Sequence, residues 1–344
     1  MKEDFLKKRI TIYQVSKESG YSLATVSRVI NNKDNVTEET KKKILSVIEK
    51  LGYKHSMIAQ GLAKSKSANI GIVIPSSMHT YVASMLSGMV DIAKIYGYQT
   101  TLFVTSQNKD EVSDVVVNVI ASNVDGAVVF DDQLSETDIE KLVNYGTPVS
   151  VIGREIKKEN VASIPLDYVS SIKEAVNKHF ENSDDPINFL HINNASAMME
   201  NLEKIAKEEC AKLGKADKFN TIEVEDSYSK TLEQFIKYFT NNRNGFFIAP
   251  RDTISCGVAN AANYHNISIP KDISILSIIG TKYSTIVSPK LTCCDIDMYE
   301  VGSIAMRMLT KLLNNTLKIK SYPFVSTIQY RDSTIQKWII IKNS

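Results

Sequence analysis

The chain has 344 residues, of which 43% are apolar and 23% charged, the balance of a globular protein with material for about two or three domains. No apolar run approaches the roughly 18 residues that a membrane-spanning helix needs, and the opening Met1-Lys2-Glu3-Asp4 is unlike a secretion signal. The four cysteines show no metal-ligand spacing. We therefore expect a cytoplasmic protein that uses no membrane, metal or cofactor.

The net charge of +2 hides an asymmetry between the two ends of the chain. Residues 1–68 carry 14 Lys and Arg against 7 Asp and Glu, whereas the other residues carry 27 against 32. A small basic unit joined to a larger acidic one is typical of a protein that binds nucleic acid through its smaller part. Short N-terminal segments are also often basic by chance, so charge alone does not decide.

The basic unit is predicted to contain three short helices separated by tight turns. The first begins at Thr11 and Gln14, which form a capping-box pair. The second runs from Leu23 to about Asn31, and the third ends at Gly52. Two short helices joined by a turn and braced by a third have helix-turn-helix geometry.

The second of these helices exposes side chains suited to DNA. Arg28 is able to donate two hydrogen bonds to a guanine edge, and Thr25 and Ser27 are short donors for phosphate. Leu23 and Ala24 lie at the helix start, which is the part that enters a major groove. The alternative that spacing leaves open is a plain three-helix cap whose polar face is only solvated.

Residues 10–16, 22–32, 36–53 and 58–63 closely resemble the DNA-binding domain of the LacI/GalR family of bacterial transcription regulators. The resemblance implies that Leu23, Ala24 and Arg28 read bases. The DNA contacts predicted in total are Thr11, Tyr13, Leu23, Ala24, Thr25, Ser27, Arg28, Asn32, Tyr53, Ile58, Ala59 and Leu62.

The resemblance also implies a hinge helix over residues 56–63, ordered on DNA in the dimer. Leu62 would wedge into the minor groove at the operator centre and kink the DNA. The sequence departs from the family in having His55 and Gln60 where Pro and Arg are usual.

From residue 70 onward, short apolar runs alternate with amphipathic segments, which predicts parallel sheets covered by helices. The predicted strands form two series, 70–74, 100–104, 126–130 and 148–152, then 187–192, 221–224, 246–249 and 273–279. We expect a small all-α helix-turn-helix domain followed by an α/β effector domain of two parallel-sheet subdomains, the periplasmic-binding-protein-like architecture. The predicted boundaries are 1–55 for the DNA-binding domain, 56–69 for hinge and linker, 70–335 for the effector and dimerisation domain, and 336–344 for a C-terminal extension.

Nothing in the sequence indicates catalysis. The 14 glycines are scattered, and there is no Gly-rich phosphate loop. The five histidines occur in no HExxH or nucleophile-elbow context. We expect no catalytic residue, and therefore no enzyme.

An effector cleft is expected between the two subdomains, at the carboxyl ends of the strands. Family members that bind sugars or purines commonly place an Arg and an Asp there. Asp252 is present, but the segment after residue 192 offers Asn193 and no Arg. His79 follows the first strand. We predict a cleft lined by these three residues and altered from the sugar-binding pattern, with an ordinary site for an unidentified ligand as the alternative.

A helix predicted over residues 297–311 carries a pair of basic residues. Arg307 and Lys311 are one turn apart on the same face, an arrangement suited to a phosphate or carboxylate. On spacing alone, a solvated basic edge is an equally good interpretation.

This helix is also similar to the one by which catabolite-control members of the family bind serine-phosphorylated HPr. Carried over position by position, Tyr299, Arg307, Met308 and Lys311 would contact that partner. Those members also lack the sugar-binding Arg. Ser87 departs from them, because it replaces a basic residue.

Together these patterns predict a transcriptional regulator, mostly a repressor, that binds a pseudo-palindromic operator in double-stranded DNA as a homodimer at the bacterial nucleoid. The preferred corepressor is serine-phosphorylated HPr. One alternative is a pathway repressor that responds to a small sugar or sugar phosphate. The other is a cytoplasmic sugar-binding or sugar-processing protein with no role on DNA.

Overall fold

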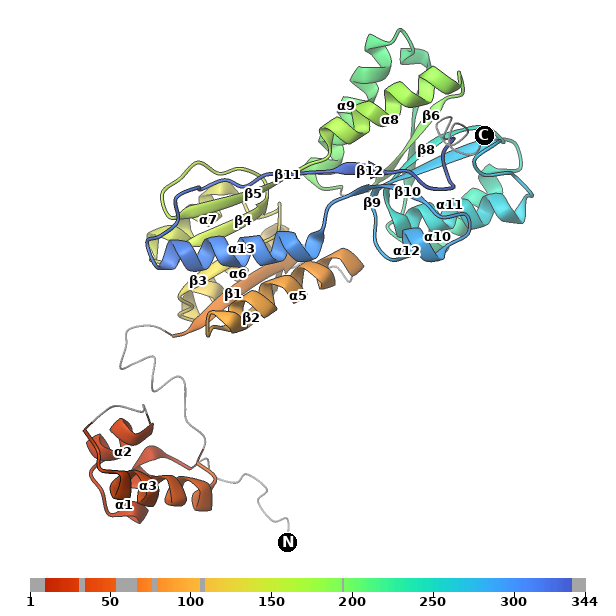
Figure 1. The fold of residues 1–344 in the computed structure, drawn as a ribbon. Coiled ribbons are helices and arrows are strands. Elements are labelled where there is room, and N and C mark those ends of the chain that lie inside the picture. Colours follow the sequence, from red (N-terminus) through yellow and green to blue (C-terminus); the bar gives the residue numbers. More distant parts are fainter. Residues whose placement is uncertain are drawn as a thin grey trace, which may run out of the picture. The chain divides into compact units, whose positions relative to one another are not determined.

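The chain divides into two compact units, Met1–Ser67 and Ala68–Ser344, which we describe separately (Figure 1). The computed structural model describes residues 10–30, 35–53, 67–75, 79–105, 109–193 and 195–335, with the backbone alone for 109–113. The predicted hinge helix, the C-terminal extension and the predicted DNA contacts Asn32, Ile58, Ala59 and Leu62 lie outside these residues.

The first unit is a three-helix domain, as the spacing of its apolar residues predicts. Val15, Val26 and Ile44, one from each helix, are completely buried against one another in its core. Gly52 ends the last helix in the left-handed conformation, with a φ of 64° that favours glycine. The helices are α1 (Ile12–Ser19), α2 (Leu23–Ile30) and α3 (Glu38–Leu51).

The second unit contains two six-stranded sheets, and each sheet forms the centre of one subdomain. The first sheet has the order β11-β5-β4-β3-β1-β2 and the second the order β12-β10-β9-β8-β6-β7. Neighbouring strands are parallel, except that β12 runs antiparallel to β10. The two parallel sheets confirm the predicted α/β effector domain.

The bounds of these elements are as follows. The first sheet comprises β1 (Asn69–Pro75), β2 (Gln99–Thr105), β3 (Gly126–Val129), β4 (Val149–Gly153), β5 (Val161–Asp167) and β11 (Phe324–Val325). The second comprises β6 (Ile187–Ile192), β7 (Phe219–Val224), β8 (Gly245–Arg251), β9 (Ile273–Ile279), β10 (Thr292–Asp295) and β12 (Thr327–Gln329). The helices are α5 (Thr80–Ile95), α6 (Lys109–Ala121), α7 (Glu136–Asn144), α8 (Val169–Asn182), α9 (Ala197–Lys212), the 3₁₀ turn η1 (Ala216–Lys218), α10 (Tyr228–Tyr238), α11 (Asp252–Tyr264), α12 (Tyr283–Ile286) and α13 (Met298–Leu313).

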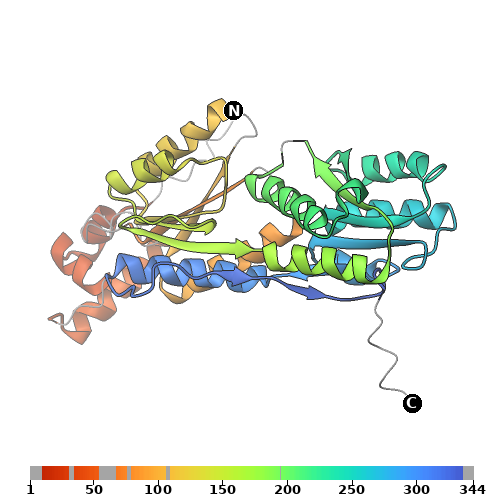
Figure 2. The ribbon, with the colours of Figure 1, turned by 90° about the horizontal axis from the view of Figure 1, so that it is seen from above.

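The chain crosses between the two subdomains after β5, after β10 and between β11 and β12. Two of these crossings are bonded to each other, because the Ser171 hydroxyl lies 2.8 Å from the Ser326 hydroxyl and the Ser326 N–H donates to the Asp167 carbonyl at 2.8 Å. Figure 2 shows the two subdomains end to end, with the crossing segments between them.

Helices α5 and α13 pack together so closely that their backbones touch (Figure 1). A Cβ atom on Gly88 would lie 2.0 Å from the Tyr299 carbonyl oxygen, and one on Gly302 would lie 2.0 Å from the Met85 carbonyl oxygen. Only glycine therefore fits at these two positions. In the described part of the chain, no helix has the length and apolarity that crossing a membrane requires.

We expect Gly302→Ala to destabilise the second unit by about 1–3 kcal/mol, the usual cost of overpacking. The added methyl group would force α5 and α13 apart, although alanine is by itself about 1 kcal/mol better than glycine in a helix. Urea unfolding followed by circular dichroism measures the change. Ser84→Ala, at an exposed position of α5, is the control, and a stabilising Gly302→Ala would contradict the backbone contact.

Candidate DNA interface and effector cleft

The exposed face of α2 carries the side chains predicted to read bases. Leu23 is 37% exposed, and Ala24 and Arg28 are also exposed. Val26 and Val29 point the other way and are buried in the three-helix core. The core thus holds α2 rigidly while its first turn and Arg28 remain accessible to a large ligand.

Hydrogen bonds at the start of α2 determine where this face points. The Ser22 hydroxyl accepts from the Thr25 N–H at 3.2 Å and lies 2.9 Å from the Thr25 hydroxyl. This is an N-cap, and it satisfies a backbone donor that the helix leaves free. Thr25 and Ser27, the predicted phosphate donors, are half-buried. Their side chains are therefore less accessible than that of Arg28.

The remaining predicted DNA contacts in the described part lie on α1 and after α3. Tyr13 is 71% exposed on α1. Thr11 caps the same helix, and its backbone N–H donates to the Gln14 side chain at 2.8 Å, as the capping-box signature predicts. Tyr53 is half-buried against the core of the unit. Thr11 and Tyr13 are exposed, whereas Tyr53 offers only part of its side chain.

In the second unit, polar side chains join the two subdomains across the cleft. Asp226 follows β7 in the second subdomain, and its Oδ2 lies 2.9 Å from Nη2 of Arg251 and 3.4 Å from Nε2 of His79. His79 belongs to the first subdomain, where it precedes α5, and its Nε2 also contacts Nη1 of Arg251. We call His79, Asp226 and Arg251 the cleft latch.

A second contact across the cleft supports the latch. The Asp132 carboxylate, which follows β3 in the first subdomain, accepts from the Ala197 N–H at the start of α9 at 3.1 Å. His79 also stacks on Tyr81, with ring centroids 5.5 Å apart and an angle of 9° between the planes. Polar groups of both subdomains therefore meet at the carboxyl ends of their strands.

The charge state of the latch follows from its surroundings. Burial alone would raise the pKa of the Asp226 carboxyl, but the hydrogen bond from His79 and the guanidinium of Arg251 together hold that pKa below its usual value. Because a guanidinium is always charged and only donates, Arg251 remains a cation held between two partners. Its Nε is buried and, among the described residues, has no hydrogen-bond partner.

The three predicted cleft residues occupy different environments. His79 is part of the latch, and Asn193 is exposed just after β6. Asp252 is only 1% exposed, and its carboxylate accepts from the Thr281 N–H at 2.5 Å and from the Thr281 hydroxyl at 2.7 Å. Its carboxylate joins the start of α11 to the loop after β9, and the contact of Asp252 with an effector stays a prediction.

The basic pair predicted on α13 lies on the surface. Arg307 and Lys311 are both exposed, and neither forms an ion pair with any described residue. Tyr299 is 40% exposed, and its hydroxyl donates to Asp91 of α5 at 3.0 Å. Met308 is only 6% exposed and packs in the core, and its contact with a partner stays a prediction.

Asp226, Arg251 and Asp132 were not predicted as cleft residues from the sequence. All three stand at or just after the carboxyl end of a strand, which is where this kind of sheet binds ligands. That rule applied to every strand would have found them. Among the residues described, no group of three or more His, Cys, Asp or Glu side chains is placed to hold a metal ion.

The comparisons with known proteins agree with this fold. The profile of bacterial regulatory proteins of the lacI family matches residues 11–56, and that of the periplasmic binding protein-like domain matches residues 195–334. The chain belongs to the LacI family, and it is a DNA-binding transcriptional regulator with a helix-turn-helix domain. The proteins it resembles are transcription regulators and not enzymes.

Individual relatives place the chain near the catabolite-control regulators. It is 30% identical to catabolite control protein A of Priestia megaterium over 335 residues, which cover 94% of this chain and 99% of the relative. The Lac repressor dimer bound to operator and an anti-inducer has a similar fold, with a TM-score of 0.81, 19% identity and coverage of 96% of this chain and 100% of the other. A LacI-family regulator of Weissella paramesenteroides solved with bound sucrose has a TM-score of 0.66 at 18% identity and covers 78% of this chain and 98% of its own.

We expect Asp226→Asn to weaken the cleft latch by about 0.2–1 kcal/mol, the range measured for ion pairs that solvent partly reaches. Urea unfolding of His79→Ala, Asp226→Asn and the double variant gives the coupling energy between the two side chains. A coupling energy of zero would contradict an interaction between them. Asp114→Asn, on an exposed part of α6, is the control. Since the pKa of Asp226 is lowered, its stabilisation is present above the usual Asp pKa and is lost as the pH falls through the lowered value. The effect of Asp226→Asn should disappear over that same interval.

Proposed function

We propose that this regulator binds a pseudo-palindromic operator as a homodimer, with α2 of each protomer in one major groove. The exposed face formed by Leu23, Ala24 and Arg28 is the observation that carries the proposal. An arginine on such a helix reads guanine through two hydrogen bonds, and two-fold symmetry of the protein implies two-fold symmetry of the site. The Lac repressor, which shares the fold, was solved as a dimer on its operator. Leu62 would act as the wedge in the minor groove.

The same proposal includes serine-phosphorylated HPr as the corepressor, bound on α13. Arg307 and Lys311 offer two cations one helical turn apart, with Tyr299 half-exposed on the same helix. A phosphoserine presents a dianion with strong acceptor oxygens, which pairs well with such groups. The similarity to catabolite control protein A over nearly the whole chain supports this choice of partner.

A signal bound on α13 has a short path to the cleft. Helix α13 follows the crossing after β10 and touches α5 at Gly88 and Gly302. His79, at the start of α5, belongs to the cleft latch. A partner that binds better to one arrangement of α5 and α13 would therefore shift the equilibrium between open and closed clefts. That equilibrium would in turn control the DNA-competent state.

One observation favours a second function, in which a small anionic sugar derivative is the effector. Arg251 is a buried cation whose Nε has no partner among the described residues. A sugar phosphate in the cleft would replace Asp226 as its partner and so break the latch. A family relative solved with sucrose bound supports a carbohydrate as the ligand.

We expect Arg28→Ala to remove operator preference and leave weak binding to any DNA. The loss of one two-bond contact to guanine should cost about 1–3 kcal/mol of discrimination between operator and scrambled duplexes. Fluorescence anisotropy at fixed salt measures both affinities, because phosphate contacts make binding strongly salt-dependent. Lys17→Ala, at an exposed position of α1, should leave the ratio of the two affinities unchanged. Undiminished specificity in Arg28→Ala would show that α2 does not read the operator.

The corepressor is tested by Arg307→Glu. We expect serine-phosphorylated HPr to tighten operator binding by the wild-type protein and to have no effect on the variant, whose new carboxylate repels the phosphate. Operator binding without HPr should stay the same. Arg243→Glu, at an exposed arginine after α10, is the matched control and should still respond. If HPr has no effect on the wild type while a sugar phosphate does, the second function replaces the first.

A further inference from the structure

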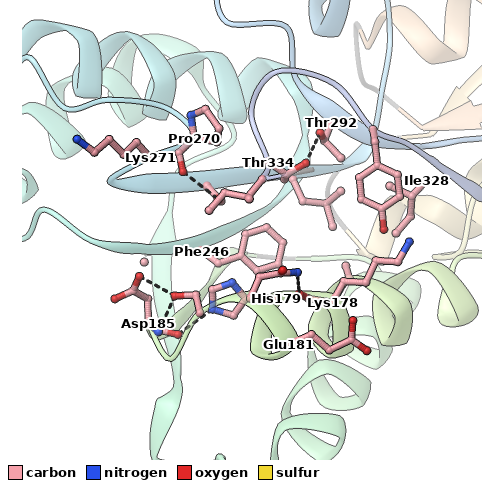
Figure 3. A pocket seen from close by; sticks show the side chains of 18 of the residues that line it. Lys178, His179, Glu181, Asp185, Phe246, Pro270, Lys271, Thr292, Ile328 and Thr334 are labelled. Carbon is pink, nitrogen blue, oxygen red and sulfur yellow. Dashed lines mark hydrogen bonds between the residues drawn. The ribbon is translucent and has the colours of Figure 1, made fainter. Parts of the chain in front are cut away.

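A cavity of about 660 Å³ lies at the end of the second subdomain opposite the cleft (Figure 3). Gly245 and Ser274, which line it, stand at the amino ends of β8 and β9, whereas the cleft lies at the carboxyl ends. Its size is that of pockets that bury most of a bound molecule. None of the DNA-binding, latch or α13 residues described above lines this cavity.

The cavity has an aromatic and apolar floor. The rings of His179 and Phe246 stack with centroids 4.9 Å apart, and Leu276 and Ile328 add apolar surface. Figure 3 shows the two stacked rings beside each other, facing the open space. Burial lowers the pKa of His179, whose Nε2 lies 2.8 Å from the Asp185 carbonyl oxygen, so the imidazole is neutral at pH 7. The floor is therefore suited to apolar side chains.

The last described residues of the chain, Thr334 and Ile335, line this cavity. Ser333 is bonded to β9, since its hydroxyl donates to the Ile275 carbonyl at 2.6 Å and its carbonyl accepts from the Ile275 N–H at 2.8 Å. The Thr334 hydroxyl lies 2.7 Å from the Thr292 hydroxyl of β10. Ile335, the last described residue, lines the cavity and is 44% exposed. The next residues of the chain therefore start from the rim of the cavity.

Those residues, Gln336-Lys337-Trp338-Ile339-Ile340-Ile341-Lys342-Asn343-Ser344, contain four large apolar side chains in a row. We propose that this segment, 336–344, docks in the cavity of its own chain and buries Trp338 and neighbouring isoleucines against the aromatic floor.

Three properties favour this occupant over a free ligand. The segment is joined to the rim, and a short tether raises its effective concentration to about the millimolar range without any new contact. Burying large apolar side chains is favourable in itself, and leaving four in water would create an exposed apolar patch. The charges also match, because the lining holds Glu181, Asp185 and Asp272 against Lys178 and Lys271, whereas the segment carries two lysines and no acid.

Trp338 is the single tryptophan of the chain, so its fluorescence reports on the segment alone. In the full-length protein we expect blue-shifted emission and an acrylamide quenching constant several-fold lower than in urea-unfolded protein. Ser274→Phe fills the cavity and loses only a 3.5 Å hydrogen bond to the Pro270 carbonyl. It should raise the quenching constant to the unfolded value, while Ser122→Phe, at an exposed serine of the first subdomain, should not.

A second variant tests the same proposal without changing any residue that lines the cavity. Replacing Ile339, Ile340 and Ile341 together by Asp alters only the segment, and it should also expose Trp338 while circular dichroism stays unchanged. A fully quenchable Trp338 in the wild type, or a shielded Trp338 in folded Ser274→Phe, would overturn the proposal. Shielding that appears only at high protein concentration would also overturn it, because the segment would then occupy a second copy.

Discussion

The contact between α5 and α13 is the constraint on which the regulatory parts of the second unit depend. Gly88 and Gly302 allow the two helix backbones to touch, and any larger residue would collide with a carbonyl oxygen of the other helix. The helices cannot separate or slide without breaking this contact. The packed pair lies between the exposed basic residues on α13 and the cleft residue His79 before α5.

The cleft latch joins His79, next to α5, to Asp226 and Arg251 of the second subdomain. Its ion pairs are partly open to solvent, so each contributes little to the stability of the fold. A weak latch is what a switch needs, since a bound partner can change the populations only by the difference in its affinity for the two states. The crossings between the subdomains are held together through Ser171 and Ser326.

The contacts of single side chains depend on neighbours that come from other parts of the sequence. Met308 was assigned to a partner surface through a family resemblance, and it is 6% exposed in this chain. Asp252 was assigned to the cleft, and its carboxylate accepts hydrogen bonds from Thr281. A resemblance transfers positions along the chain, whereas these contacts follow from the folded structure, and the two assigned roles stay predictions.

The amino-acid sequence by itself determined the three-helix domain, the alternation of strands and helices and the exposed face of α2, because these follow from local periodicity and capping residues such as Thr11 and Gly52. Strands β5, β10, β11 and β12 and helices α8 and α12 were not predicted. Only the tertiary structure decided the latch, since His79, Asp226 and Arg251 are far apart in the chain. The same is true of the cavity at the other end of the sheet, because a hollow exists only where several elements meet.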